Sequence, residues 1–182
     1  MYNVCQKECM EEKTLYIATL VFPVTEDRRM VTLGDKQRGI GAGFLNGWGG
    51  GVEPGETLKQ CACREFYEET GGVVISTNTI QKIGIVHFKN HKTDGTVFVC
   101  TVHVYVTTAW LGSICDTVEM KNARWFSVEN LATENLMPAD PFWLPRMLGG
   151  DKGIAWAEYG PHQSHLIGEV IFESVTSFDD EE

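Results

Sequence analysis

The chain has 182 residues, of which 43% are hydrophobic, and this length and composition suit one compact domain with a sizeable core. Its formal net charge is −10. Such acidity argues against a nucleic-acid polymer as ligand, because like charges repel, but it allows a phosphate that a divalent cation bridges to carboxylates. We expect residues 1–182 to form a single domain, with residues 1–13 and 176–182 frayed.

The six cysteines form no CxxC pair and show no zinc-finger spacing, so we expect free thiols in a reducing cytoplasm. The polar N-terminal sequence MYNVCQKECMEEK lacks the apolar segment of a signal peptide. No apolar run has the length needed to cross a bilayer. The sequence therefore predicts a cytoplasmic protein that binds no membrane, and it favours a monomer over an oligomer.

The first predicted elements are strands. A continuous apolar, β-branched and aromatic run over residues 14–24 is typical of a buried strand, and a second short strand follows at residues 30–33. Residues 39–55 are rich in glycine, which indicates loops around one short strand.

A helix is predicted at residues 57–70. Thr57 and Gln60 have the spacing of a capping box, in which each side chain satisfies the backbone N–H of the other. Gly71 and Gly72 follow directly and stop the helix, because glycine readily leaves the helical conformation.

The second half of the chain alternates short strands with short helices. Strands are predicted at residues 80–88, 97–107, 124–126, 153–159 and 166–174, and helices at residues 127–132 and 142–148. The chain is therefore predicted to be a mixed α/β domain in which strands outnumber helices.

Three carboxylates share one face of the helix predicted at residues 57–70. Glu65, Glu68 and Glu69 occupy positions i, i+3 and i+4, within an arc of about 100°. A bound cation would remove their mutual repulsion, and ligands that are all oxygen favour Mg²⁺, with Mn²⁺ as the alternative, over zinc. This geometry alone leaves open a merely solvated acidic helix face.

The wider spacing removes that alternative. Gly50 is followed by five residues, Glu56, seven residues and then REFYEETG at residues 64–71. This pattern resembles the signature of the Nudix hydrolases, G-x5-E-x7-R-E-apolar-x-E-E-x-G-apolar, and departs from it only at Gly72. The resemblance implies an α/β fold with a mixed β-sheet sandwiched between helices. It also implies attack of a metal-activated water on a diphosphate, with Mg²⁺ as cofactor and Mn²⁺ as a possible substitute.

The resemblance also assigns roles around the metal. It makes Glu65 and Glu69 ligands together with a loop carbonyl, Glu68 a further ligand or a proton-transfer group, and the pair Glu56 and Arg64 a structural ion pair. The implied catalytic residues are Glu65, Glu68, Glu69 and Glu119, and the implied metal ligands are Gly49, Glu65, Glu68, Glu69 and Glu119.

Two readings of Glu119 stay open. In the resembled enzymes a glutamate five residues before a Trp-Phe pair is a metal ligand or general base, whereas Glu119 lies six residues before Trp125. A β-bulge would absorb the extra residue, and otherwise Glu119 is a surface glutamate.

Further segments resemble the Nudix members that hydrolyse oxidised purine nucleoside triphosphates, namely KQRGIGAGFLNGWGG at residues 36–50 and MPADPFWLP at residues 137–145. The resemblance implies that an asparagine and an acid read the base, because an amide and a carboxylate can pair with a purine edge. Lys36 is expected at the entrance of the substrate site or on the surface. The implied substrate-binding residues are Lys36, Asn46, Gly49, Gly50, Met137 and Asp140.

Two departures bear on the substrate. Ala139 replaces the first of two acids in those enzymes, and Met137 replaces a tryptophan, so the range of bases should narrow or change. The resemblance implies hydrolysis of 8-oxo-dGTP to its monophosphate and pyrophosphate, which clears the nucleotide pool and limits DNA damage. The alternatives are another Nudix substrate (a dinucleoside polyphosphate, a nucleotide sugar or an RNA cap) and a catalytically silent nucleotide-binding module.

Overall fold

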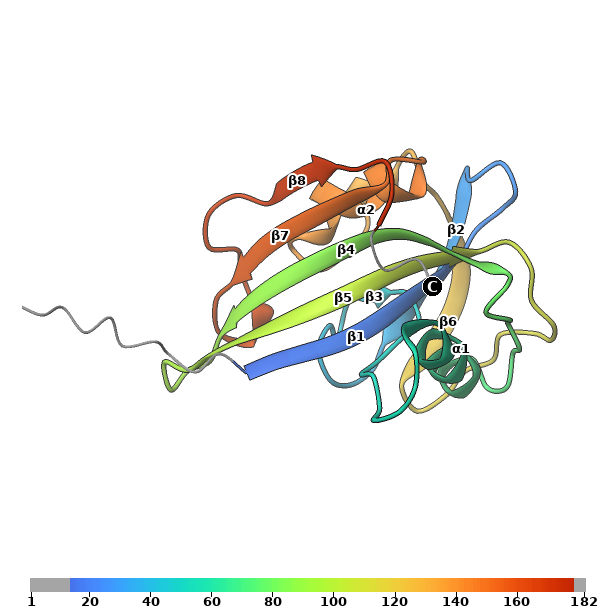
Figure 1. Cartoon of the computed structure of the whole chain (residues 1–182), viewed down its shortest axis with the longest axis horizontal. Coiled ribbons are helices and arrows are strands. Elements are labelled where there is room, and N and C mark those ends of the chain that lie inside the picture. Colours follow the sequence, from blue (N-terminus) through green and yellow to red (C-terminus); the bar gives the residue numbers. More distant parts are fainter. Residues whose placement is uncertain (1–13, 179–182) are drawn as a thin grey trace, which may run out of the picture.

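A five-stranded mixed sheet spans the length of the molecule (Figure 1). The computed structural model describes residues 14–178. Neighbouring strands pair in parallel at β1–β5 and β4–β7 and antiparallel at β5–β4 and β7–β8. In spatial order the strands are β1 (Thr14–Pro23), β5 (Val97–Thr107), β4 (Ile80–His91), β7 (Gly153–Tyr159) and β8 (Ile171–Ser174).

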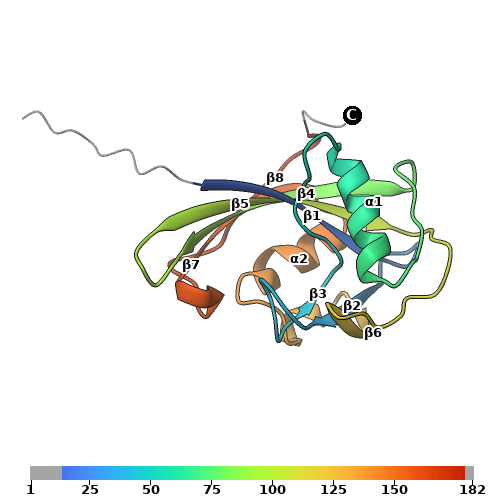
Figure 2. The same cartoon turned by 90° about the horizontal axis from the view of Figure 1, so that it is seen from below.

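A second, antiparallel sheet has the order β3-β2-β6 and lies with α2 on one side of the large sheet (Figure 2). Both packing faces of this region are apolar, so the two sheets enclose a core between them. The elements are β2 (Met30–Lys36), β3 (Leu45–Asn46), β6 (Met120–Ser127) and α2 (Asp140–Leu148).

The large sheet carries a core on each face. Consecutive strand residues point to opposite faces, and Val104 and Tyr105 of β5 accordingly belong to different clusters. Val104 packs in the cluster that contains Trp143 of α2, whereas Tyr105 packs in the cluster that contains Phe66 of α1 (Leu58–Glu69). The predicted α/β architecture, a mixed sheet between helices, is therefore confirmed.

The helix α1 begins and ends as its sequence predicts. Thr57 is the N-cap, its Oγ1 accepts from the Gln60 N–H at 3.2 Å, and Gln60 Oε1 accepts from the Thr57 N–H at 2.8 Å. Thr70 is the C-cap, and Gly71 follows with φ +74°, a conformation that favours glycine.

The helix predicted at residues 127–132 is wrong. Ser127 still belongs to β6, where it pairs with Met30, and the next helical turn is the short 3₁₀ helix η1 (Leu131–Thr133). The pairing partner on β2 lies about a hundred residues away in sequence, so the local pattern could not reveal that the strand continues.

Three strands are longer than predicted. β2 extends to Lys36 instead of residue 33, β4 extends to His91 instead of residue 88, and β6 begins at Met120 instead of residue 124.

Two further boundaries differ. α2 begins at Asp140 rather than at residue 142, because Pro141 fits the first helical turn, where its missing N–H costs nothing. The last strand is shorter than predicted: Leu166 forms only an isolated bridge, a 3₁₀ helix η2 (Pro161–Gln163) precedes it, and Gly168 with φ +76° interrupts the extended run before β8.

The segments expected to fray are described only in part. Of the segments expected to fray, residues 1–13 and 179–182 lie outside the described range, whereas Phe178 is buried and the amino groups of Lys82 and Lys152 lie over its ring. No helix within residues 14–178 is long and apolar enough to span a bilayer.

Thr57→Ala should lower the free energy of unfolding by about 1 kcal/mol. The Gln60 N–H loses its acceptor, and the reciprocal hydrogen bond from the N–H of residue 57 to the Gln60 side chain is no longer supported by it. Urea denaturation followed by circular dichroism measures this. Thr57→Ser keeps the hydroxyl and should stay within about 0.5 kcal/mol of the unsubstituted chain. Equal losses in both variants would mean that the capping hydrogen bond contributes nothing.

Candidate active site

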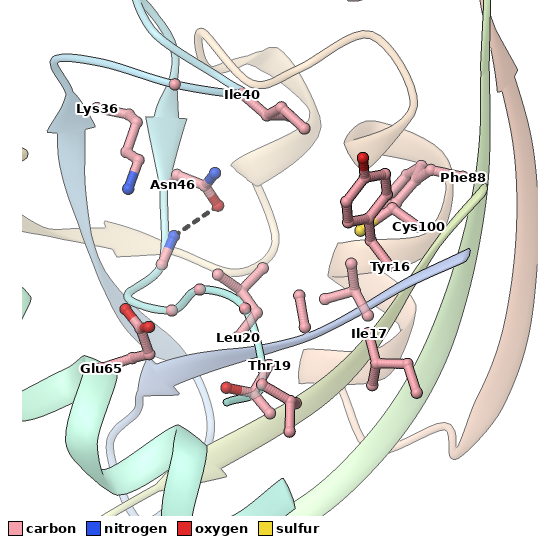
Figure 3. A pocket seen from close by; sticks show the side chains of 18 of the residues that line it. Tyr16, Ile17, Thr19, Leu20, Lys36, Ile40, Asn46, Glu65, Phe88 and Cys100 are labelled. Atoms are coloured by element: carbon pink, nitrogen blue, oxygen red, sulfur yellow. Dashed lines mark hydrogen bonds between the residues drawn. The ribbon is translucent and has the colours of Figure 1, made fainter. Parts of the chain in front are cut away.

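A cleft of about 1080 Å³ lies between the large sheet, α1, the loop before α1 and the start of α2. Figure 3 shows Lys36 and Asn46 on one wall and Tyr16, Phe88 and Cys100 on the other. Every site residue that the sequence indicates lines this cleft: Lys36, Asn46, Gly49, Gly50, Glu65, Glu68, Glu69, Glu119, Met137 and Asp140.

The glycine-rich loop lies directly between β1 and α1. Gly50 O accepts from the Thr19 N–H at 2.9 Å, so the loop continues the sheet alongside β1. A Cβ at Gly49 would overlap the Thr19 carbonyl, and a Cβ at Gly50 would lie 2.5 Å from the Glu65 carboxylate. Only glycine allows the loop backbone to approach both neighbours this closely.

Arg64 anchors this loop to the helix. Its guanidinium donates from Nε and Nη2 to the two oxygens of Glu56 at 3.1 and 2.7 Å, and Nη2 also donates to Gly51 O at 3.1 Å. These hydrogen bonds lower the pKa of Glu56 to about 2. The Glu56–Arg64 pair is therefore structural, as the family resemblance implies, and Nη1 also holds Glu65 at 2.7 Å.

A second cluster of charges crosses the cleft from α1 to the small sheet. Glu69 is only 4% exposed, accepts from the Gly49 N–H at 2.9 Å, and forms an ion pair with the buried ammonium of Lys36. Lys36 Nζ also lies 3.5 Å from Glu119, whose other oxygen pairs with Arg38. Burial raises the pKa of Glu69 while Lys36 opposes this, and the Arg38 hydrogen bond lowers the pKa of Glu119.

The carboxylates of this end fit a hard divalent cation in donor type, since all are oxygen ligands. Within residues 14–178 no three acidic, histidine or cysteine side chains are yet arranged around a common metal position. Each carboxylate instead pairs with a basic side chain: Glu69 with Lys36, and Glu65 and Glu68 with Arg64. The predicted metal ligands therefore share one cleft, and their binding of an ion stays a prediction.

Glu119 reaches the cleft through a β-bulge in β6. The register with β2 passes from Leu33↔Arg124 to Asp35↔Lys121, so two residues of β6 oppose one of β2. Asn122, inside the bulge, has φ +52°. The bulge lies between Glu119 and Trp125, and Glu119 lines the cleft, while its role as a metal ligand or general base stays a prediction.

The other end of the cleft presents amide, thioether and carboxyl groups. Asn46 Oδ1 accepts from the Gly47 N–H at 2.9 Å, which leaves the Nδ2 amino group as a donor. An added Cβ at Gly41 would lie 3.1 Å from Asn46 Nδ2 and 3.2 Å from Met137 Sδ, so these two groups are neighbours. The site residues of β3 and of the segment before α2 thus meet at this end.

Asp140 is a buried acid that has no cationic partner among residues 14–178. It is 5% exposed, Oδ1 accepts from Trp143 Nε1 at 3.1 Å, and Oδ2 has no donor among residues 14–178. Burial raises its pKa to about 7, which the Trp143 hydrogen bond only partly offsets. A carboxyl group that titrates near neutrality can donate or accept a hydrogen bond toward a ligand.

Several residues of the cleft are absent from the sequence-based assignment. Arg38 pairs with Glu119, and an aromatic wall is formed by Phe88, Trp143 and Tyr159, with Phe88 stacked on Tyr159 at a centroid distance of 5.8 Å. Trp143 could have been found from its i+3 spacing to Asp140, whereas Phe88 and Tyr159 meet only through the parallel pairing of β4 with β7.

Comparison with known proteins shows the family of the chain. The family model of the NUDIX domain matches residues 14–147. The oxidized purine nucleoside triphosphate hydrolase of Danio rerio is 32% identical over 160 residues, which are 86% of this chain and 97% of that protein. The enzyme of the same name from Mus musculus is 35% identical over 139 residues, 76% of this chain and 82% of that protein.

A solved structure shares the fold. The mutator MutT protein of Bacillus halodurans matches with a TM-score of 0.70 at 20% identity, covering 87% of this chain and 97% of that one. The chain therefore belongs to the Nudix family, and the resemblance seen in its sequence is confirmed. It is an enzyme, a Nudix hydrolase.

Gly50→Ala should lower kcat by at least about tenfold, because the new methyl group would displace the Glu65 carboxylate from the loop backbone. Gly51→Ala is the matched control, since an added Cβ there meets no heavy atom within 4 Å. Steady-state hydrolysis of a nucleoside triphosphate measures both variants, and circular dichroism checks folding. Equal activity of the two alanine variants would contradict the tight contact.

Proposed function

We propose that this enzyme hydrolyses an oxidised purine nucleoside triphosphate, 8-oxo-dGTP before others, to the monophosphate and pyrophosphate with Mg²⁺. Mn²⁺ is the alternative metal. The observation that supports the proposal is the division of one cleft into a carboxylate end and a base-binding end, with Asn46 and Asp140 at the latter. Two relatives with 32% and 35% identity are named for this substrate class.

At the phosphate end, Glu65, Glu68, Glu69 and the Gly49 carbonyl would hold the metal, which supplies charge neutralisation and an activated water when bound. The Lys36 ammonium lies in the same cleft and offsets phosphate charge. Glu69 is almost fully buried, whereas Glu68 and Glu119 are more exposed to the open cleft, so we assign the uptake of the proton of the attacking water to one of these two carboxylates.

At the base end, Asp140 and Asn46 pair with the purine edge. An ionised Asp140 accepts from the N1–H and 2-amino groups of an oxidised guanine, and the Asn46 Nδ2 group donates to a base oxygen. Met137 adds apolar contact, and the rings of Phe88 and Tyr16 offer the flat surface that Met137 lacks.

The same proposal places the enzyme in the cytoplasm as a monomer that acts on small nucleotides and thereby limits DNA damage. The four cysteines within residues 14–178 are free thiols, the state expected in a reducing compartment. The formal charge of −10 disfavours a long nucleic acid as substrate.

The test is release of pyrophosphate, with Mg²⁺ and then Mn²⁺, from 8-oxo-dGTP, 2-hydroxy-dATP, the ordinary dNTPs and a dinucleoside polyphosphate. We expect kcat/KM for 8-oxo-dGTP to exceed that for dGTP by about tenfold or more. Preference for the dinucleoside polyphosphate would move the function to another Nudix substrate. Binding of nucleotides without turnover would indicate a silent binding module.

Glu69→Gln should reduce kcat by more than about a hundredfold, because the neutral amide is a poor metal ligand and loses its charge interaction with Lys36. The measurement is 8-oxo-dGTP turnover over a range of Mg²⁺ concentrations. Glu53→Gln is the control, since Glu53 lines the same cleft but lies outside the three-glutamate face. Near-normal turnover of the Glu69 variant would remove the proposed metal site.

The affinity for 8-oxo-dGTP should depend on pH through Asp140. Its pKa of about 7 means that the accepting carboxylate forms as the pH rises through neutrality. KM should therefore fall several-fold from about pH 6 to about pH 8. Asp140→Asn cannot ionise, so its KM should be higher at pH 8 by about tenfold and should vary little with pH. An unchanged pH profile in the variant would exclude this role.

A further inference from the structure

The hydroxyl group of Tyr159 lies at the base end of the cleft and has no part in the function proposed above. Tyr159 is the last residue of β7, is 1% exposed and lines the cleft together with Asp140 and Asn46. Its ring stacks on Phe88 at 5.8 Å with an interplanar angle of 30°. The position of the hydroxyl group is thus fixed by the sheet and not by a mobile loop.

The hydrogen bonds of this hydroxyl group are incomplete. It accepts from the Ala139 N–H at 3.0 Å, at the start of α2, where Ala139 offers no capping side chain. A phenol also has one hydrogen to donate, and no acceptor for it is present among residues 14–178. A buried donor without an acceptor costs free energy, so a ligand that supplies one is favoured.

The hydroxyl group also keeps its proton. Burial, and then the nearby charge of Asp140, raise the pKa of Tyr159 far above its usual value. Ala139 is completely buried and brings no polar side chain to this place. The base end therefore presents an acceptor, the Asp140 carboxylate, beside a donor, the Tyr159 O–H.

This order of donor and acceptor matches one purine edge. A guanine-type base carries an acceptor, the 6-oxygen, next to the N1–H donor, whereas an adenine-type base carries an amino donor at position 6. We propose that Tyr159 is a specificity-determining residue, which donates a hydrogen bond to the 6-oxygen of an oxidised guanine while Asp140 accepts from its N1–H. The inference rests on the proposed function and assigns its preference for guanine to a residue outside the family signature.

Binding of the monophosphates 8-oxo-dGMP and 8-oxo-dAMP, by titration calorimetry without turnover, tests this. The unsubstituted protein should bind 8-oxo-dGMP at least about tenfold more tightly. Tyr159→Phe should weaken 8-oxo-dGMP about tenfold and 8-oxo-dAMP less than about twofold. Tyr67→Phe is the matched control, because it removes the same hydroxyl group from a tyrosine of α1 that is 52% exposed and does not line the cleft, and it should leave both affinities unchanged.

The other outcomes separate this inference from the proposed function. If Tyr159→Phe weakens both nucleotides equally or neither, the hydroxyl group only caps the Ala139 N–H, and the inference alone is wrong. If the unsubstituted protein binds the two nucleotides equally well, the inference alone is again wrong, and this result does not depend on the folding of a variant. If the unsubstituted protein binds neither nucleotide, the inference and the proposed function are both wrong. Thermal unfolding of each variant confirms that binding is measured on folded protein.

Discussion

The close approach of the loop at residues 47–51 to β1 on one side and α1 on the other is the constraint on which the site depends. Because Gly49 lies against the Thr19 carbonyl and Gly50 against the Glu65 carboxylate, no side chain of the loop at these two positions separates it from the sheet or from Glu65 of the helix. The carboxylates of Glu65, Glu68 and Glu69 therefore line a cleft whose walls include the large sheet. Glycine is needed at these two positions because a side chain would prevent the close contacts. Backbone conformation is not the reason, since neither Gly49 nor Gly50 has a positive φ angle.

Charge balance within the cleft explains how an acidic chain can concentrate carboxylates there. Lys36 and Arg64, together with Arg38, pair with the four glutamates of the phosphate end. Such partly buried pairs orient the carboxylates, and the Lys36 ammonium opposes the rise in the pKa of Glu69 that burial causes. If a cation and a polyphosphate bind together, as we propose, they would bring charges of both signs, so each carboxylate and each basic group could change partner without any buried charge losing its counter-charge.

The signature segment could be predicted almost completely, because caps and spacing are local: Thr57, Gln60 and Gly71 alone define α1. The base end could be predicted only through resemblance, and only for Asn46, Met137 and Asp140. Its remaining members depend on non-local pairing. Tyr159 reaches the cleft because β7 lies parallel to β4, and no sequence pattern near residue 159 indicates that neighbour. Non-local pairing also explains the wrong prediction of a helix at residues 127–132, because β6 continues to Ser127 through its pairing with β2.

The bulge in β6 has a consequence for how this chain tolerates change in length. An additional residue in a strand ordinarily turns every later side chain to the opposite face. Here the two residues opposite Gly34 confine the addition to one point, with Asn122 taking the unusual backbone conformation. Residues on both sides keep their faces, so Glu119 still meets Lys36 while Phe126 still packs against the core. The length of β6 can therefore change at the bulge without a change in the position of the site residues.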